Sequence, residues 1–61
     1  MKLLKPKQAA EILGVRMETL RRWANEGLIR PVQLPGRRSY MYAEKELERF
    51  IKENTVTKEA Q

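Results

Sequence analysis

The sequence predicts a mainly α-helical domain of three helices with a small two-stranded β-hairpin. Two short segments carry apolar residues at helical spacing, and each is followed by a glycine. The pattern then changes to strand-like alternation on either side of Pro35-Gly36, and a third helical segment follows. A chain of 61 residues has room for one compact domain. We place this domain at residues 1–54 and expect a frayed polar tail at 55–61.

The first helix is predicted to begin at Pro6, because the first helical position needs no backbone N–H. Gly14 ends it, since glycine readily adopts the left-handed conformation of a helix end. A second helix is predicted for residues 17–26, and its apolar side consists of Met17, Leu20, Trp23 and Ala24. About three residues separate the two helices, which is the spacing of a helix-turn-helix.

The next segments predict a hairpin and a third helix. Residues 30–34 alternate in polarity and residues 39–42 are rich in strand formers, so we expect two short paired strands. Pro35-Gly36 favours a type II turn in a loop longer than two residues, with a basic tip. The third helix is predicted for residues 43–54, where Leu47, Phe50 and Ile51 form an apolar seam.

The composition excludes most catalytic chemistry. The chain has no Cys, His or Asp, and Ser39 is its only serine. The usual nucleophiles, general bases and metal ligands are therefore missing, so we expect neither an enzyme nor a bound metal or cofactor. No apolar run approaches the length of about 20 residues that a membrane span needs, and the start does not resemble a secretory signal. We expect a cytoplasmic protein without a membrane partner.

The positive charge is concentrated in the first two thirds of the chain. The net charge is +5, and nine of the 13 Lys and Arg but only three of the eight Glu precede Ala43. A basic body followed by a nearly neutral end is typical of a surface that binds a polyanion.

The segment 8–15, followed by 19–23 and 26–29, resembles the DNA-binding domain of the MerR and excisionase superfamily. The later part, from Pro35-Gly36-Arg37-Arg38 to Glu46-Leu47, resembles the wing of that family and the helix behind it. The resemblance covers roughly residues 3–53 and implies a winged helix-turn-helix of three helices and a two-stranded wing. Its second helix enters the major groove of DNA, and its wing lies over the adjacent minor groove or phosphates. Arg16 departs from the Ser or Thr that usually precedes the second helix.

The resemblance and the charges together give candidate DNA contacts. The recognition-helix candidates are Arg16, Glu18, Thr19, Arg21, Arg22 and Asn25, and the wing candidates are Arg37, Arg38, Ser39 and Tyr40. Arg21 suits a phosphate, whereas Arg22 suits guanine, to which arginine can donate two hydrogen bonds. Glu18 either accepts from cytosine or pairs with Arg22 four residues later. Lys5 and Lys7 are candidate phosphate contacts at the start of the first helix.

We therefore expect a small sequence-specific protein that binds double-stranded DNA, either an excisionase (a recombination directionality factor) or a stand-alone transcriptional regulator. One module of this size buries only about 600–1,000 Å² on DNA, so partners are expected: an integrase or recombinase, or further copies bound side by side. Three alternatives remain open. They are the N-terminal DNA-binding domain of a serine recombinase, transposase or larger MerR-type regulator, an RNA-binding module, and a basic protein-interaction module.

Overall fold

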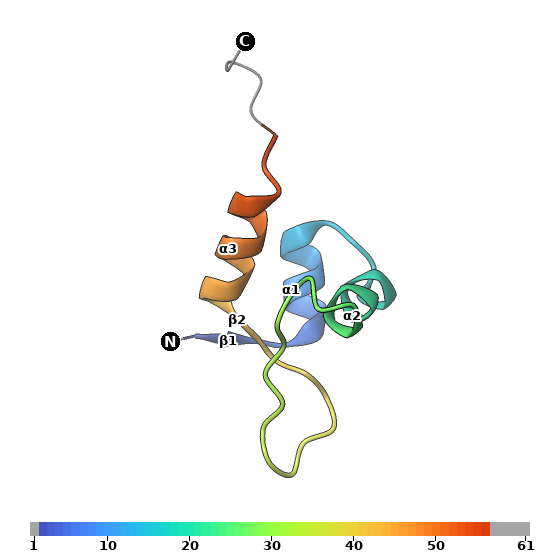
Figure 1. Cartoon of the computed structure of the whole chain (residues 1–61). Coiled ribbons are helices and arrows are strands. Elements are labelled where there is room, and N and C mark those ends of the chain that lie inside the picture. The colour runs from blue at the N-terminus through green and yellow to red at the C-terminus, as the bar shows by residue number, and fades with distance from the viewer. Residues whose placement is uncertain (1, 57–61) are drawn as a thin grey trace.

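The computed structural model describes residues 2–56, which form three helices and one small antiparallel sheet (Figure 1). In chain order the elements are β1 (Leu3–Leu4), α1 (Pro6–Leu13), α2 (Met17–Asn25), β2 (Tyr42–Ala43) and α3 (Glu44–Glu53). The three predicted helices and the mainly helical fold class are confirmed. Most of the predicted tail, residues 57–61, lies outside the described residues. Within the described residues, no helix is both long enough and apolar enough to span a bilayer.

Both ends of α1 are set by the residues that the sequence singled out. Pro6 is its first residue, and the Gln8 side chain accepts a hydrogen bond from the Lys5 N–H at 3.0 Å. At the other end Gly14 has φ 71, and the Gly14 and Val15 N–H groups donate to carbonyls of the last turn at 3.2 and 3.0 Å. This pair of bonds is a Schellman motif, which turns the chain sharply into α2.

The core lies where the three helices and β2 meet. Its buried side chains are Leu4, Ala9, Ala10, Leu20, Ile29, Tyr42 and Leu47. The two alanines leave α1 a smooth face, so that α2 and α3 both pack against it. Trp23 of α2 and Phe50 of α3 are half-buried at the edge of this core, with ring centroids 5.1 Å apart. The prediction that Trp23 belongs with the core is confirmed.

The predicted hairpin is wrong in one respect. Its two segments are joined only by an isolated bridge between Val32 and Met41, whose backbone N–H groups each donate to the other residue's carbonyl at 2.7 Å. The regular partner of β2 is instead β1, with Leu3 opposite Ala43 and Leu4 opposite Tyr42. The next N–H that could extend the bridge is that of Arg30, and it donates to the Glu46 carboxylate instead. Pairing with β1 brings Leu4 into the core.

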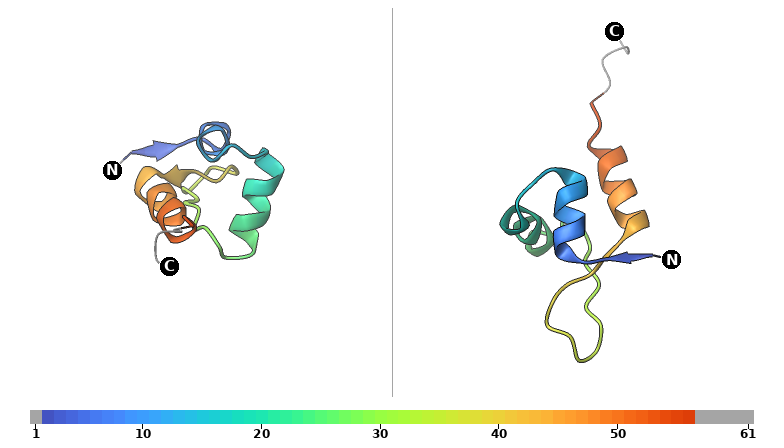
Figure 2. Two further views of the ribbon diagram at one scale, coloured as in Figure 1. Left: turned by 90° about the horizontal axis from the view of Figure 1, so that it is seen from above. Right: turned by 180° about the vertical axis from the view of Figure 1, so that it is seen from behind.

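Residues 33–40 form a loop that we call the wing loop. It projects from the helices on the side opposite to the C-terminal end of α3 (Figure 2). Its turn has Gly36 at φ 80, and the Arg37 N–H donates to the Leu34 carbonyl at 3.1 Å. This is the geometry of the predicted type II turn, in which the third residue needs a positive φ. The Gln33 side chain donates to the Arg37 carbonyl at 3.4 Å and braces the loop from within.

A polar network ties α3 to the segment that follows α2. The Glu46 carboxylate accepts from the Arg30 N–H at 2.9 Å and from the Arg49 Nε at 3.0 Å. Arg49 also donates to the Leu28 carbonyl at 3.3 Å and pairs with Glu53. Glu46 therefore fixes the chain at the point where it leaves α2 for the wing loop. The hydrogen bond from Arg49, and to a smaller extent the one from the Arg30 N–H, holds the pKa of Glu46 below its usual value, although partial burial opposes this.

We expect Glu46→Gln to lower the free energy of unfolding at pH 7 by about 1 kcal/mol, because a charge-assisted network becomes a neutral one. The lowered pKa of Glu46 in the folded chain stabilises the fold above the ordinary carboxyl pKa. That stabilisation disappears as the pH falls through the lowered pKa. Below about pH 5, the free energy of unfolding should therefore fall more in the unchanged protein than in the variant. Urea unfolding followed by Trp23 fluorescence measures it.

The matched control is Glu48→Gln, which removes an exposed carboxylate from the same helix. It should leave both the stability at pH 7 and its acid dependence nearly unchanged. If the stability of the Glu46→Gln variant ran parallel to that of the unchanged protein at every pH, the proposed contribution of Glu46 would be wrong.

Candidate nucleic-acid interface

α2 has one face in the core and one in solvent. Leu20 is buried, and Trp23 and Ala24 are half-buried against the core. The exposed side chains of the opposite face are Glu18, Arg21, Arg22 and Asn25. Thr19 is half-buried at the edge between the two faces. The helical spacing in the sequence thus places four of the candidate contacts on one solvent-facing surface.

Arg16 is the residue immediately before α2. Its backbone is extended, at φ −75 and ψ 155, and its side chain makes no capping hydrogen bond. Its carbonyl accepts from the Leu20 N–H at 3.1 Å and so begins the helix. The exposed guanidinium is left free of a capping role, next to N–H groups that carry the positive end of the helix dipole.

One prediction for α2 is wrong. Met17 was placed on the apolar side with Leu20, yet it is 51% exposed. It is the first residue of α2, and its side chain lines the cleft between α2 and the wing loop rather than the core. Helical spacing alone does not reveal this exposure, because Met17 lies three residues before Leu20 and so on the same side of the helix.

After its turn the wing loop carries three consecutive exposed polar residues, Arg37, Arg38 and Ser39, and then the half-buried Tyr40. The Arg37 guanidinium lies 3.7 Å from the Met41 sulfur, which directs it back along the loop. Tyr42 is buried, whereas Tyr40 is not. Tyr40 packs against the edge of the core rather than within it.

Lys5 lies with the wing loop, which the sequence did not predict. A shallow depression of about 270 Å³ is lined by Lys5, Pro6, Gly36, Arg37, Arg38 and Ser39. The cause is the sheet, because Lys5 directly follows β1 and β1 is paired with β2 at the end of the wing loop. Lys7 is also exposed, but it does not line this depression.

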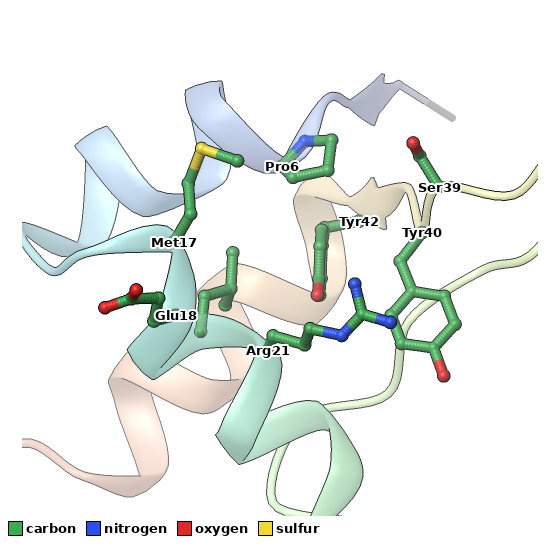
Figure 3. A pocket seen from close by; sticks show the side chains of 8 residues that line it. Pro6, Met17, Glu18, Arg21, Ser39, Tyr40 and Tyr42 are labelled. Atoms are coloured by element: carbon green, nitrogen blue, oxygen red, sulfur yellow. The ribbon is translucent and has the colours of Figure 1, made fainter.

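A second cleft, of about 280 Å³, connects the wing loop with α2 (Figure 3). Its lining residues are Pro6, Met17, Glu18, Leu20, Arg21, Ser39, Tyr40 and Tyr42. The Arg21 guanidinium carbon lies 5.9 Å from the centre of the Tyr40 ring, within the range of a cation–π contact. Burial raises the pKa of Tyr42 and the neighbouring Tyr40 adds to the rise, whereas the charge of Arg21 acts in the opposite direction.

The two groups of candidates therefore adjoin each other, and together they are the candidate surface. The α2 group and the wing group share this cleft, and Lys5 joins the wing group. Glu18 is the acidic member of the surface. Among residues 2–56 the ion pairs are both made by Arg49, so the pairing of Glu18 with Arg22 does not form. In the same part of the chain, no group of three Cys, His, Asp or Glu side chains could hold a metal ion.

A family model for the helix-turn-helix domain matches residues 3–55. The chain belongs to this helix-turn-helix family. The two helices of the motif are α1 and α2, and residues 14–16 join them. Membership of this family makes the chain a DNA-binding protein. Comparisons with curated proteins and with solved structures give no match. In helix-turn-helix proteins the second helix lies in the major groove and its N-terminal residues reach the bases, which makes the exposed face of α2 the candidate reading surface.

We expect Lys5→Ala to weaken duplex binding by this helix-turn-helix domain more than Lys7→Ala does. Both substitutions remove one exposed charge, but only Lys5 shares the depression with Arg37 and Arg38. If Lys5 neutralises one phosphate, its loss lowers the slope of log affinity against log salt by about 0.9. Binding of one duplex at several salt concentrations measures both effects. Equal slopes of log affinity against log salt for the two variants would contradict a shared role of Lys5 and the wing loop in DNA binding.

Proposed function

We propose that the chain is a sequence-specific protein that binds double-stranded DNA and acts without catalysis. The observation that carries this proposal is the single basic surface on which the exposed face of α2 and the wing loop share one cleft. A helix fits the major groove, and a basic loop beside it suits the adjacent minor groove or its phosphates. The family membership supports DNA as the partner.

The roles proposed for the α2 residues follow from their positions. Arg22 is exposed in the middle of the polar face and is assigned to a base edge, with guanine as the fitting partner. Arg21 and Arg16 are assigned to phosphates, and Glu18, unpaired with Arg22, to a cytosine amino group. Thr19 and Asn25 flank these residues at the edge and at the end of the helix.

The proposed wing contacts are Arg37, Arg38 and Ser39, supported by Lys5 from the start of the chain. Tyr40, the fourth wing candidate, lies beside Arg21 instead. A narrow minor groove concentrates negative potential and attracts arginine. The three wing contacts and Lys5 lie around the depression beside the turn of the wing loop, so they meet the DNA as a group. Lys7 is kept as a weaker candidate, because it is exposed but lies apart from that depression.

The biological role proposed is that of a small excisionase or a stand-alone transcriptional regulator, acting by binding in several copies or by bending DNA. A single module of this size makes a small contact, which favours neighbouring copies or an integrase or recombinase as partner. The alternative is that these residues are the DNA-binding domain of a serine recombinase, a transposase or a larger MerR-type regulator. Because DNA is the partner, the proposed location is the cytoplasm, on the nucleoid.

The placement of the aromatic residues argues against the RNA-binding alternative. Recognition of unpaired RNA bases uses exposed aromatic rings as stacking surfaces. Tyr42 is buried, while Trp23 and Phe50 are half-buried and packed on each other. Tyr40 is half-buried beneath the Arg21 guanidinium. The exposed side chains of this surface are those that suit phosphates and base edges of a duplex.

Selection from a random pool of duplex DNA tests the proposal. We expect one enriched motif, bound with an affinity that falls steeply with salt. The double variant Arg22→Ala/Arg38→Ala should lose most of this affinity, by about a hundredfold or more, because it removes one contact from each half of the surface. Both side chains are exposed, so thermal unfolding should be unchanged.

The matched control is Lys45→Ala/Lys52→Ala, which removes the same amount of charge from exposed positions on α3. It should keep the motif preference and most of the affinity. No enriched motif would refute sequence-specific binding. Equal losses in the two double variants would mean that net charge alone, rather than the proposed surface, attracts the DNA.

A further inference from the structure

The cleft between α2 and the wing loop has an unusual composition for a surface that is otherwise charged. Four of its lining residues, Pro6, Met17, Leu20 and Tyr42, offer mainly apolar atoms. Arg21 reaches across it from α2, and its guanidinium lies against the Tyr40 ring from the wing loop (Figure 3). The hydroxyl of Tyr42 points toward the same guanidinium. Arg21 of α2 thus contacts a residue of the wing loop that lies 19 positions later in the sequence.

We propose that Tyr40 is a positioning residue, whose ring holds Arg21 over this cleft so that the guanidinium binds one phosphate of the strand lying between α2 and the wing loop. This inference rests on the proposed function and deepens it. It assigns Tyr40 to Arg21 rather than to a DNA base. It also assigns the cleft to the sugar–phosphate ridge of one DNA strand.

The geometry of a duplex supports this assignment. If α2 lies in the major groove and the wing loop in the adjacent minor groove, one sugar–phosphate ridge must pass between them, because such a ridge separates the two grooves. The cleft lies in that position, since α2 and residues 39–42 line its two sides. Its apolar lining suits deoxyribose, and Arg21 with Ser39 supplies groups that donate to phosphate.

The chemistry of arginine explains why a ring would be needed. An arginine side chain has several rotatable bonds, and ordering them on binding costs affinity. A guanidinium can stack on an aromatic ring by its face while its N–H groups at the edge remain available to a phosphate. Glu18 also lines the cleft, but the ion pairs within residues 2–56 all involve Arg49. Arg21 therefore keeps its charge for an external anion.

The test measures affinity for the selected duplex with single phosphates replaced in turn by neutral methylphosphonate. For the unchanged protein, we expect replacement of one phosphate between the two contacted grooves to weaken binding. Arg21→Ala should bind about tenfold to a hundredfold more weakly and should no longer respond to that replacement. Tyr40→Leu should weaken binding by about threefold to fivefold, whereas Tyr40→Phe, which keeps the ring, should bind like the unchanged protein.

The decisive measurement is a double-mutant cycle. If Tyr40 acts through Arg21, then Tyr40→Leu should have little further effect once Arg21 is alanine. Additive losses would overturn the inference, as would a Tyr40→Phe variant as weak as Tyr40→Leu, because the hydroxyl would then be a contact of its own. Should Tyr40→Leu unfold, Arg21→Lys replaces it. Lysine keeps the charge without the planar face, so affinity should fall while the salt slope stays unchanged.

The unchanged protein separates this inference from the proposed function. If it selects no duplex motif, the proposed function fails. If it selects a motif, but every phosphate replacement affects the unchanged protein and the Arg21→Ala variant equally, only the positioning role of Tyr40 fails.

Discussion

The antiparallel contact between β1 and β2 joins the beginning of the chain to the end of the wing loop, and most of the surface depends on it. Leu4 and Tyr42 face each other across this contact and are both buried, so the sheet is anchored in the core. The Glu44 N–H donates to the Lys2 carbonyl at 2.9 Å and extends the contact to the first residue of α3. Because β1 leads directly into α1, the same few hydrogen bonds orient α1, α3 and the wing loop together. This pairing places Lys5 at the same depression as Arg37 and Arg38.

Local signals made the helices and the turns predictable, whereas contacts between distant residues were not. Pro6 and Gly14 act within one helical turn, and Gly36 acts within one β-turn, so the sequence around each is sufficient. β1 has only two residues, which is too short for an alternating pattern to be recognised. The hydrogen bond from the Arg30 N–H to Glu46 joins residues 16 positions apart, and no local sequence pattern predicts it. The candidate surface follows the same division. The exposed face of α2 came from helical spacing, but the positions of Lys5 and Met17 came only with the fold.

The two ends of the molecule use charge in different ways. On α3, Arg49 is bound to Glu46 and Glu53, and these carboxylates hold its pKa above the usual value. Its charge is used to fix the chain after α2. On the opposite side, Arg21 has an aromatic ring beside it rather than a carboxylate. A guanidinium neutralised by a carboxylate has little to offer a phosphate, while one held by a ring keeps its full charge.

A loop closed by one backbone bridge needs other constraints before it can contribute to specificity. The Val32–Met41 bridge closes the wing loop, the type II turn shapes its tip, and the Gln33 side chain braces it. None of these fixes the loop relative to α2. The contact between Arg21 and Tyr40 links the loop to α2, and the proposed binding mode places these two elements in neighbouring grooves. Ordering that is already present in the free protein does not have to be supplied when DNA binds. In the proposed binding mode, this contact limits the spacing between α2 and the wing loop before DNA binds.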